Sequence, residues 1–274
     1  MKQTPTFKNP PIVEFVLGVQ FAPLTRMTSA HHGRFWDFLG GDWGNPRDNP
    51  PIPDQFERFE GAAAADRRLH LKLEHGPVVN RVTFINQAEN RLLQIQPTRF
   101  HLNWRKSDDF YPSYKSLIKE FEDMLARFTA FCDREAIGPI EMNQWEITYV
   151  DAFPRGEYWD TPADWGRFLP GLFNRDRPQP VAPLRLENRS VAWAMEIEPK
   201  LGRLHLQASL GRWKSEAAEA LMLDLTARGP IGPASTTSYR DGLELGHDVA
   251  VEQFLHMVSE ETKQRWGTAN DRSS

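Results

Sequence analysis

Apolar residues recur at steps of three and four along residues 113–135, the strongest structural signal in the chain. They are Tyr114, Leu117, Ile118, Phe121, Met124, Leu125, Phe128 and Phe131. Such spacing places the side chains on one face of an α-helix. The stripe therefore predicts a long amphipathic helix that covers a sheet, with Pro112 in its first turn and an end near Gly138-Pro139.

A second helix of this kind is predicted near the C-terminus. Residues 248–265 carry Val251, Phe254, Leu255 and Val258 at helical spacing, and Gly267 can end the helix. Residues 12–21 and 145–153 instead alternate apolar and polar side chains, which is typical of half-buried strands. Helices and strands are thus both expected.

The order of predicted elements occurs twice. The first half contains strand 12–21, a short helix after Thr28, strands 69–73, 78–86 and 92–105, and the long helix; Pro97 predicts a bulge or bend in the last strand. The second half contains strand 145–153, a short helix near 161–169, strands 191–197, 204–210 and 220–227, and the C-terminal helix. We therefore predict an α+β fold made by internal duplication. Two similar β-α-β-β-β-α lobes, at 10–138 and 139–267, form a curved antiparallel sheet with the long helices on one face, and tails lie at 1–9 and 268–274.

Composition narrows the choice of partners. The chain has 33 Lys and Arg against 37 Asp and Glu, a formal net charge of −4 without a basic block in either half, so extended duplex nucleic acid is an unfavourable partner. No stretch approaches the roughly 18 apolar residues that span a bilayer, and residues 1–22 lack a signal-peptide pattern. The single Cys132 cannot form an internal disulfide. We expect a cytoplasmic protein without a membrane partner.

The sequence lacks the signatures of common catalytic sites. No two of its eight histidines have the i, i+4 spacing of a zincin, no Gly-x-Ser-x-Gly elbow occurs, and Gly40-Gly41 lacks the Lys-Ser/Thr ending of a phosphate loop. We therefore predict no cofactor, no metal and a protein that is not an enzyme. One alternative stays open, because His101 and His205 could meet across the sheet as a metal or acid–base pair.

Polar side chains with forked donors gather on one side of the predicted sheet. Arg, Asn and Gln suit the directional recognition of carboxylates, phosphates or bases better than the Thr, Lys and Glu of an ordinary solvent-facing strand. We predict a binding face made of Gln94, Gln96, Arg99, His101, Asn103, Arg105, Glu146, Arg203 and His205. The alternative is an ordinary exposed polar face, or one that bridges the two lobes.

An ordered set of short motifs resembles a sporadically distributed bacterial family of unknown function. The motifs are Asn9-Pro10-Pro11-Ile12-Val13-Glu14, residues 93–100 leading to Asn103-Trp104-Arg105, Tyr111-Pro112-Ser113-Tyr114, residues 146–150, residues 225–229, and the His247 helix ending in Trp266-Gly267. The resemblance covers nearly the whole chain and implies a shared fold and a patchy, mobile-element-like occurrence, but no activity. One departure is Asp151-Ala152, where the family leads us to expect Asn followed by a polar residue or His.

Three functional hypotheses follow. The first is a non-enzymatic recognition protein whose partner is another protein encoded nearby, as a component of a defence or toxin-neutralising operon. The second is a sensor of a small anionic ligand or nucleotide, with Arg99, Arg105 and Arg203 as anion contacts. The third is a metal-dependent hydrolase or nuclease built on His101, His205, Glu146 and Asp151.

Overall fold

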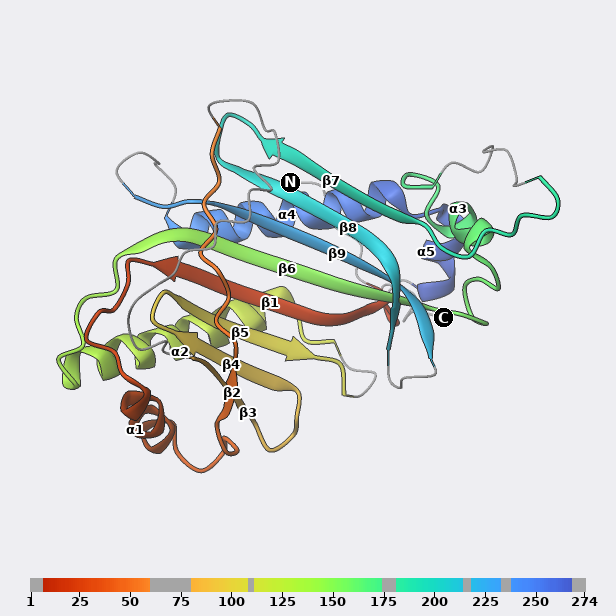
Figure 1. The fold of residues 1–274 in the computed structure, drawn as a ribbon. Helices are drawn as coiled ribbons and strands as arrows, with labels where there is room; N and C mark the ends of the chain where they lie inside the picture. The colour runs from red at the N-terminus through yellow and green to blue at the C-terminus, as the bar shows by residue number, and fades with distance from the viewer. Residues whose placement is uncertain are drawn as a thin grey trace, which may run out of the picture.

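One antiparallel sheet of nine strands organises the protein. The structure is a computed structural model and describes residues 7–59, 80–107, 111–173, 181–213, 218–232 and 238–267. The strand order is β2-β3-β4-β5-β1-β6-β9-β8-β7, with β1 and β6 side by side near the centre (Figure 1). The strands are β1 (Ile12–Phe21), β2 (Arg47–Asn49), β3 (Arg81–Ile85), β4 (Arg91–Gln96), β5 (Arg99–Arg105), β6 (Met142–Pro154), β7 (Ser190–Ile197), β8 (Gly202–Arg212) and β9 (Glu219–Pro230).

Five α-helices accompany the sheet within the described residues. They are α1 (Ser29–Leu39), α2 (Tyr114–Arg134), α3 (Trp165–Phe168), α4 (Tyr239–Met257) and α5 (Glu260–Trp266), and the short 3-10 helix η1 (Pro162–Asp164) precedes α3. The long helices α2 and α4 both run behind the sheet in Figure 1, so they cover the same face. The opposite face is called the open face below. The predicted α+β class and antiparallel sheet are confirmed.

The strand predicted at 92–105 is a hairpin. β4 ends at Gln96 and β5 begins at Arg99, and the two residues pair across the turn. The change of apolar parity at Pro97 therefore marks a reversal of the chain rather than a bend. The predicted strand 69–73 and its turn at Gly76-Pro77 lie outside the described residues.

The C-terminal helix also differs from its prediction. It starts earlier than residue 248 and divides into α4 and α5 at Ser259, whose side chain caps α5 by accepting a hydrogen bond from the Thr262 amide. Buried residues of α4 include Leu243, Gly246, Ala250 and Met257. Of the predicted stripe, Val258 is buried, whereas Val251, Phe254 and Leu255 are only half-buried.

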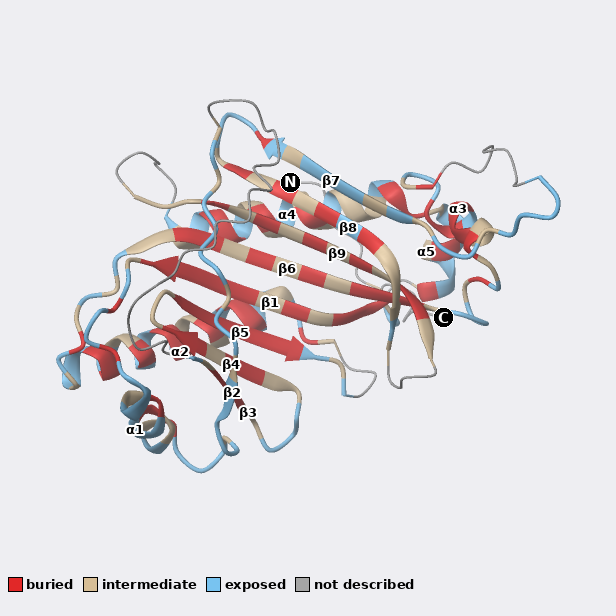
Figure 2. Cartoon of the chain, viewed as in Figure 1, coloured by how far each residue is buried: buried red, intermediate tan, exposed pale blue. Residues whose placement is uncertain are grey.

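Aromatic packing holds α2 on the sheet. Phe121 and Phe128 lie with ring centroids 5.8 Å and 5.3 Å from Phe100 on β5. Phe35 of α1 joins the cluster through Phe131, 5.0 Å away. Figure 2 shows buried residues recurring along α2 and along the central strands. Within the described residues, no helix has the length and apolar content needed to cross a bilayer.

Candidate functional site

The open face of the sheet carries the polar side chains predicted from the sequence. On β5, Phe100 and Leu102 pack on the helix side, so the strand alternation turns Arg99, His101 and Asn103 to the open face. All three are nonetheless buried, with exposed fractions of 4%, 5% and 4%. Something other than the helices must therefore cover this face.

Residues 50–59 provide the cover and are called the strap below. The strap crosses the open face from β2 towards β8, as the orange segment in front of the strands in Figure 1. Gln96 binds it at two points: its side-chain oxygen accepts a hydrogen bond from the Ile52 amide at 2.9 Å, and its amide group donates to the Ile52 carbonyl at 2.8 Å. Polar side chains of the sheet thus bind the backbone of an extended segment.

Two further contacts continue this pattern along the strap. Arg99 donates to the Pro53 carbonyl at 2.9 Å, and the Gln55 amide donates to the Gln20 side chain at 2.9 Å. In contrast, none of the apolar side chains of the strap belongs to the hydrophobic clusters of the described residues, although the Arg203 guanidinium lies 5.2 Å from the centre of the Phe59 ring. Phe56 is 52% exposed. Polar contacts therefore provide the main attachment of the strap.

The strap ends on a cationic site around Glu57. Its carboxylate forms ion pairs with Arg203, with His205 at 2.6 Å and with Arg228 at 2.6 Å, and its side chain is only 5% exposed. Burial alone would raise the pKa of Glu57, but the hydrogen bonds from His205 and Arg228 outweigh burial and lower that pKa to about 2. Arg203, His205 and Arg228 are called the Glu57 site below.

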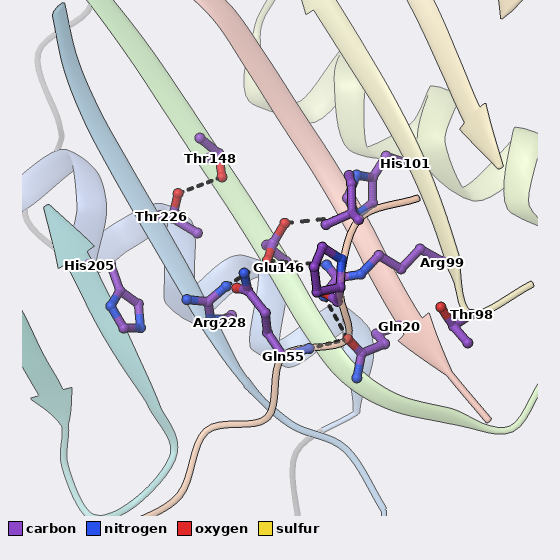
Figure 3. A network of polar contacts seen from close by, with 12 residues as sticks. Gln20, Gln55, Thr98, Arg99, His101, Glu146, Thr148, His205, Thr226 and Arg228 are labelled. Carbon is purple, nitrogen blue, oxygen red and sulfur yellow. Dashed lines mark hydrogen bonds and ion pairs between the residues drawn. The ribbon is translucent and has the colours of Figure 1, made fainter. Parts of the chain in front are cut away.

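Glu146 on β6 links the Glu57 site to β5. Its carboxylate lies 3.3 Å from Arg228, 3.7 Å from Arg99 and 3.8 Å from His101, and Figure 3 shows these side chains gathered around it. Burial would raise the pKa of Glu146, yet the three neighbours lower it, so this carboxyl is an anion at neutral pH. Gly18 on β1 makes room for this arrangement, because a Cβ there would overlap the His101 ring.

The remaining predicted residues surround a different carboxylate. Gln94 donates a hydrogen bond to Asn103 at 2.8 Å, and Asn103 donates to Glu14 at 2.6 Å. Arg105 lies 3.4 Å from Glu14, with half of its side chain exposed. The predicted face therefore contains two groups, one around Glu146 and Glu57 and the other around Glu14.

Two sequence-based pairings do not form. His101 on β5 and His205 on β8 are separated by β1, β6 and β9, so they do not meet. Asp151 lies on the helix side, among the residues around His247, whereas Glu146 lies on the open face. The four-residue hydrolase centre is therefore not assembled. Within the described residues, no group of three or more His, Cys, Asp and Glu side chains is arranged to hold a metal.

Sequence reasoning missed Glu57, the central anion of the site. Residues 40–53, rich in Gly, Pro and Asp, predict a long surface loop, and this loop includes only the start of the strap. No pattern indicated that residues 54–59 lie on a sheet. The sequence indicated a binding role for Arg228 only weakly. An arginine near a strand end can equally have a structural role, in which it donates hydrogen bonds to backbone carbonyls. Gln20 accepts a hydrogen bond from Arg99 at 2.7 Å. In the sequence it was distinguished only as a polar residue in the alternating pattern of its strand.

Comparisons with known proteins do not assign the chain to a family. No protein-family model matches the sequence. No curated protein matches it either.

Acid is expected to destabilise the protein through two buried histidines. Burial lowers the pKa of His101 to about 4, against a smaller opposite effect of Glu146, and burial also lowers the pKa of His32 to about 4. Since the unfolded chain takes up these protons near the ordinary pKa of 6.5, their contribution is complete above about pH 6.5 and is lost as the pH falls through about 4. Each histidine accounts for at most about 3–4 kcal/mol, because one pKa unit corresponds to about 1.36 kcal/mol.

Urea denaturation at pH 7 and pH 4.5 measures this loss. Carboxyl groups with a raised pKa, such as Asp151, stabilise the folded state as the pH falls and so oppose the effect of the histidines. Single histidine variants separate the contribution of each histidine from that of the carboxyl groups. His101→Gln and His32→Gln should each make the loss between the two pH values smaller than in the unsubstituted protein. An unchanged pH dependence in both variants would show that neither histidine is responsible.

Proposed function

We propose that this is a non-enzymatic recognition protein whose open face binds an extended acidic segment of another protein. The strap is then an internal occupant of the binding face, and the partner segment replaces it. The observation that carries the proposal is the Glu57 site, where Arg203, His205 and Arg228 surround one carboxylate.

The chemistry of the strap contacts supports peptide recognition. Charge-assisted hydrogen bonds between arginine and carboxylate are strong and directional. Arg203 and Arg228 project from paired strands, so they lose little freedom when they bind. Gln96, Arg99 and Gln20 contact backbone groups, which any extended segment offers.

The attachment of the strap supports its exchange. A segment held by hydrogen bonds and ion pairs, without apolar anchors in the core, opens at a lower free energy than a core strand. A partner carrying a carboxylate at the spacing of Glu57 would gain the same ion pairs. The strap would then set a threshold affinity that a partner must exceed.

A synthetic peptide with the sequence of residues 50–59 tests the proposal. Fluorescence anisotropy should show that it binds the Glu57→Gln protein, whose own strap is weakened, at least about tenfold more tightly than the unsubstituted protein. A peptide with Gln in place of its Glu serves as the matched control and should bind at least about tenfold more weakly than the original. Equal binding of both peptides would contradict the proposal.

A sensor of a small anionic ligand or nucleotide is the second candidate. It is favoured by Arg203 and Arg228 of the Glu57 site and by Arg99, which lies 3.7 Å from Glu146. Succinate and inorganic phosphate serve as probes in the anisotropy experiment. If either displaces the labelled peptide at concentrations close to those of the unlabelled peptide, the site recognises free anions rather than a protein segment.

The proposed partner is another protein encoded near the gene for this chain. The family resemblance implies a patchily distributed bacterial protein, which suits a component of a small defence or toxin-neutralising operon. The product of a neighbouring gene is therefore the first partner to test. Its binding should weaken when Arg228 is replaced by Ala, because Arg228 contacts both Glu57 and Glu146.

We also propose that the chain arose by duplication into lobes at 10–138 and 139–267. Outward from the central pair, β1 is followed by β5, β4 and β3, and β6 is followed by β9, β8 and β7. The helices α2 and α4 run along the same face (Figure 1). Superposition of the two halves tests the idea, which fails if the long helices do not coincide when the strands are aligned.

A further inference from the structure

A cavity lies on the other side of the sheet, between its helix-side face, α4 and the start of α2. Its volume is about 640 Å³, and the residues around it include Tyr111, Tyr114, Tyr149, Asp151 and His247. It is called the tyrosine cavity below. It does not touch the open face, so it is independent of the strap.

Asp151 is the unusual group in this cavity. The residue is 4% exposed, and no described residue hydrogen-bonds or ion-pairs with its carboxyl group. Burial, with a further contribution from Asp224, raises the pKa of Asp151 well above its ordinary value. Lys115 also borders the cavity, but it is exposed and forms no ion pair with Asp151. A buried carboxyl without a partner is costly, so a ligand that supplies the partner would be bound favourably.

Aromatic groups complete the polar end of the cavity. Tyr149 and His247 share a hydrogen bond, and the Tyr114 ring stacks on His247 with centroids 3.9 Å apart and planes at 2°. The Tyr114 hydroxyl is buried and has no hydrogen-bond partner among the described residues. Burial raises the pKa of Tyr111, Tyr114 and Tyr149, so these phenols are neutral. Faces of neutral aromatic rings attract cations.

The apolar end is formed by α4. Val251, Phe254 and Leu255 border the cavity and are half-buried, whereas Leu243, Gly246 and Ala250 of the same helix are buried. The cavity therefore offers an apolar surface, tyrosine rings and one unpaired carboxyl group.

We infer that the tyrosine cavity binds a small organic amine, with its ammonium group at Asp151 among the tyrosine rings and its apolar body against α4. A cation nearby favours the ionised carboxylate and forms a charge-assisted hydrogen bond with it. A ligand carboxylate would be repelled by an ionised Asp151 and could form no ion pair with it. A neutral alcohol could form a hydrogen bond with Asp151 but no ion pair. The ligand is therefore an arylalkyl or alkyl amine rather than an acid.

Isothermal titration calorimetry with 2-phenylethylamine tests this inference, with 2-phenylethanol and 3-phenylpropanoate as matched neutral and anionic probes. The amine should bind at least about tenfold more tightly than either probe, and Asp151→Asn should abolish that preference. Because Asp151 has no partner to lose, the variant should fold, and its thermal melt verifies this. Asp123→Asn, a matched change at an exposed position of α2 that is not part of the cavity lining, should leave amine binding unchanged.

Three outcomes would overturn the inference. One is amine binding that survives in folded Asp151→Asn, and another is an acid or alcohol that binds as tightly as the amine. The third is the absence of binding at millimolar concentration by 2-phenylethylamine and by a series of longer alkyl amines. None of these outcomes bears on the strap, because the peptide experiment reports on the opposite face.

Discussion

Replacement of Phe121 by Ala is expected to lower the free energy of unfolding by about 3–5 kcal/mol. Phe121 is fully buried on α2, and its ring packs 5.8 Å from Phe100 on β5. Truncation loses this contact and leaves a cavity between helix and sheet. Urea denaturation monitored by circular dichroism measures the loss.

Phe254→Ala is the matched control. The sequence placed Phe254 in the core as well, but the ring is half-buried, stacks 5.6 Å from Trp266 and borders the tyrosine cavity. The substitution should therefore cost only about 1–2 kcal/mol. A loss as large as that of Phe121→Ala would show that α4 packs differently and that the cavity is not open at this position.

Local periodicity accounts for the elements predicted best. β1 spans Ile12–Phe21, the predicted strand, because alternation along ten residues has no competing interpretation. The helix predicted at 113–135 is α2 at Tyr114–Arg134, with Ser113 capping it by accepting from the Ser116 amide. Here the pattern, the cap and the tertiary packing agree.

Tertiary packing explains why the start of α4 was missed. Gly242 and Gly246 weaken the helical signal, since glycine disfavours helices by about 1 kcal/mol relative to alanine. A Cβ at Gly242 would overlap the Trp145 ring, and one at Gly246 would contact Ile147 and Trp145 too closely. These glycines let α4 approach β6, a requirement that is invisible without knowledge of Trp145 as a neighbour.

The candidate site was predictable only in part for a similar reason. Strand alternation identified the polar side chains of β5 and β8, and the structure places them on one face. It could not identify what covers that face, because contacts between residue 57 and residues 203–228 depend on the path of an irregular segment. The tyrosine cavity likewise depends on side chains from β6, α2 and α4 that only the fold brings together.

We expect the ion pairs of the Glu57 carboxylate with Arg203 and Arg228 to hold the strap on the open face. Glu57→Gln removes the carboxylate charge and leaves Arg203 without its anion and Arg228 with Glu146 alone. Loss of one partner of a buried charge pair typically costs about 2–5 kcal/mol. The Ile52 and Gln55 amides report strap opening directly, because they donate to side chains of Gln96 and Gln20 on the sheet.

Residue-resolved hydrogen exchange of the Ile52 and Gln55 amides is the most direct test. We predict exchange at least about thirtyfold faster in Glu57→Gln than in the unsubstituted protein, the factor that corresponds to about 2 kcal/mol. Glu252→Gln, the same change at an exposed residue of α4 on the helix side of the sheet, should have little effect. Unchanged protection of both amides in Glu57→Gln would contradict the account.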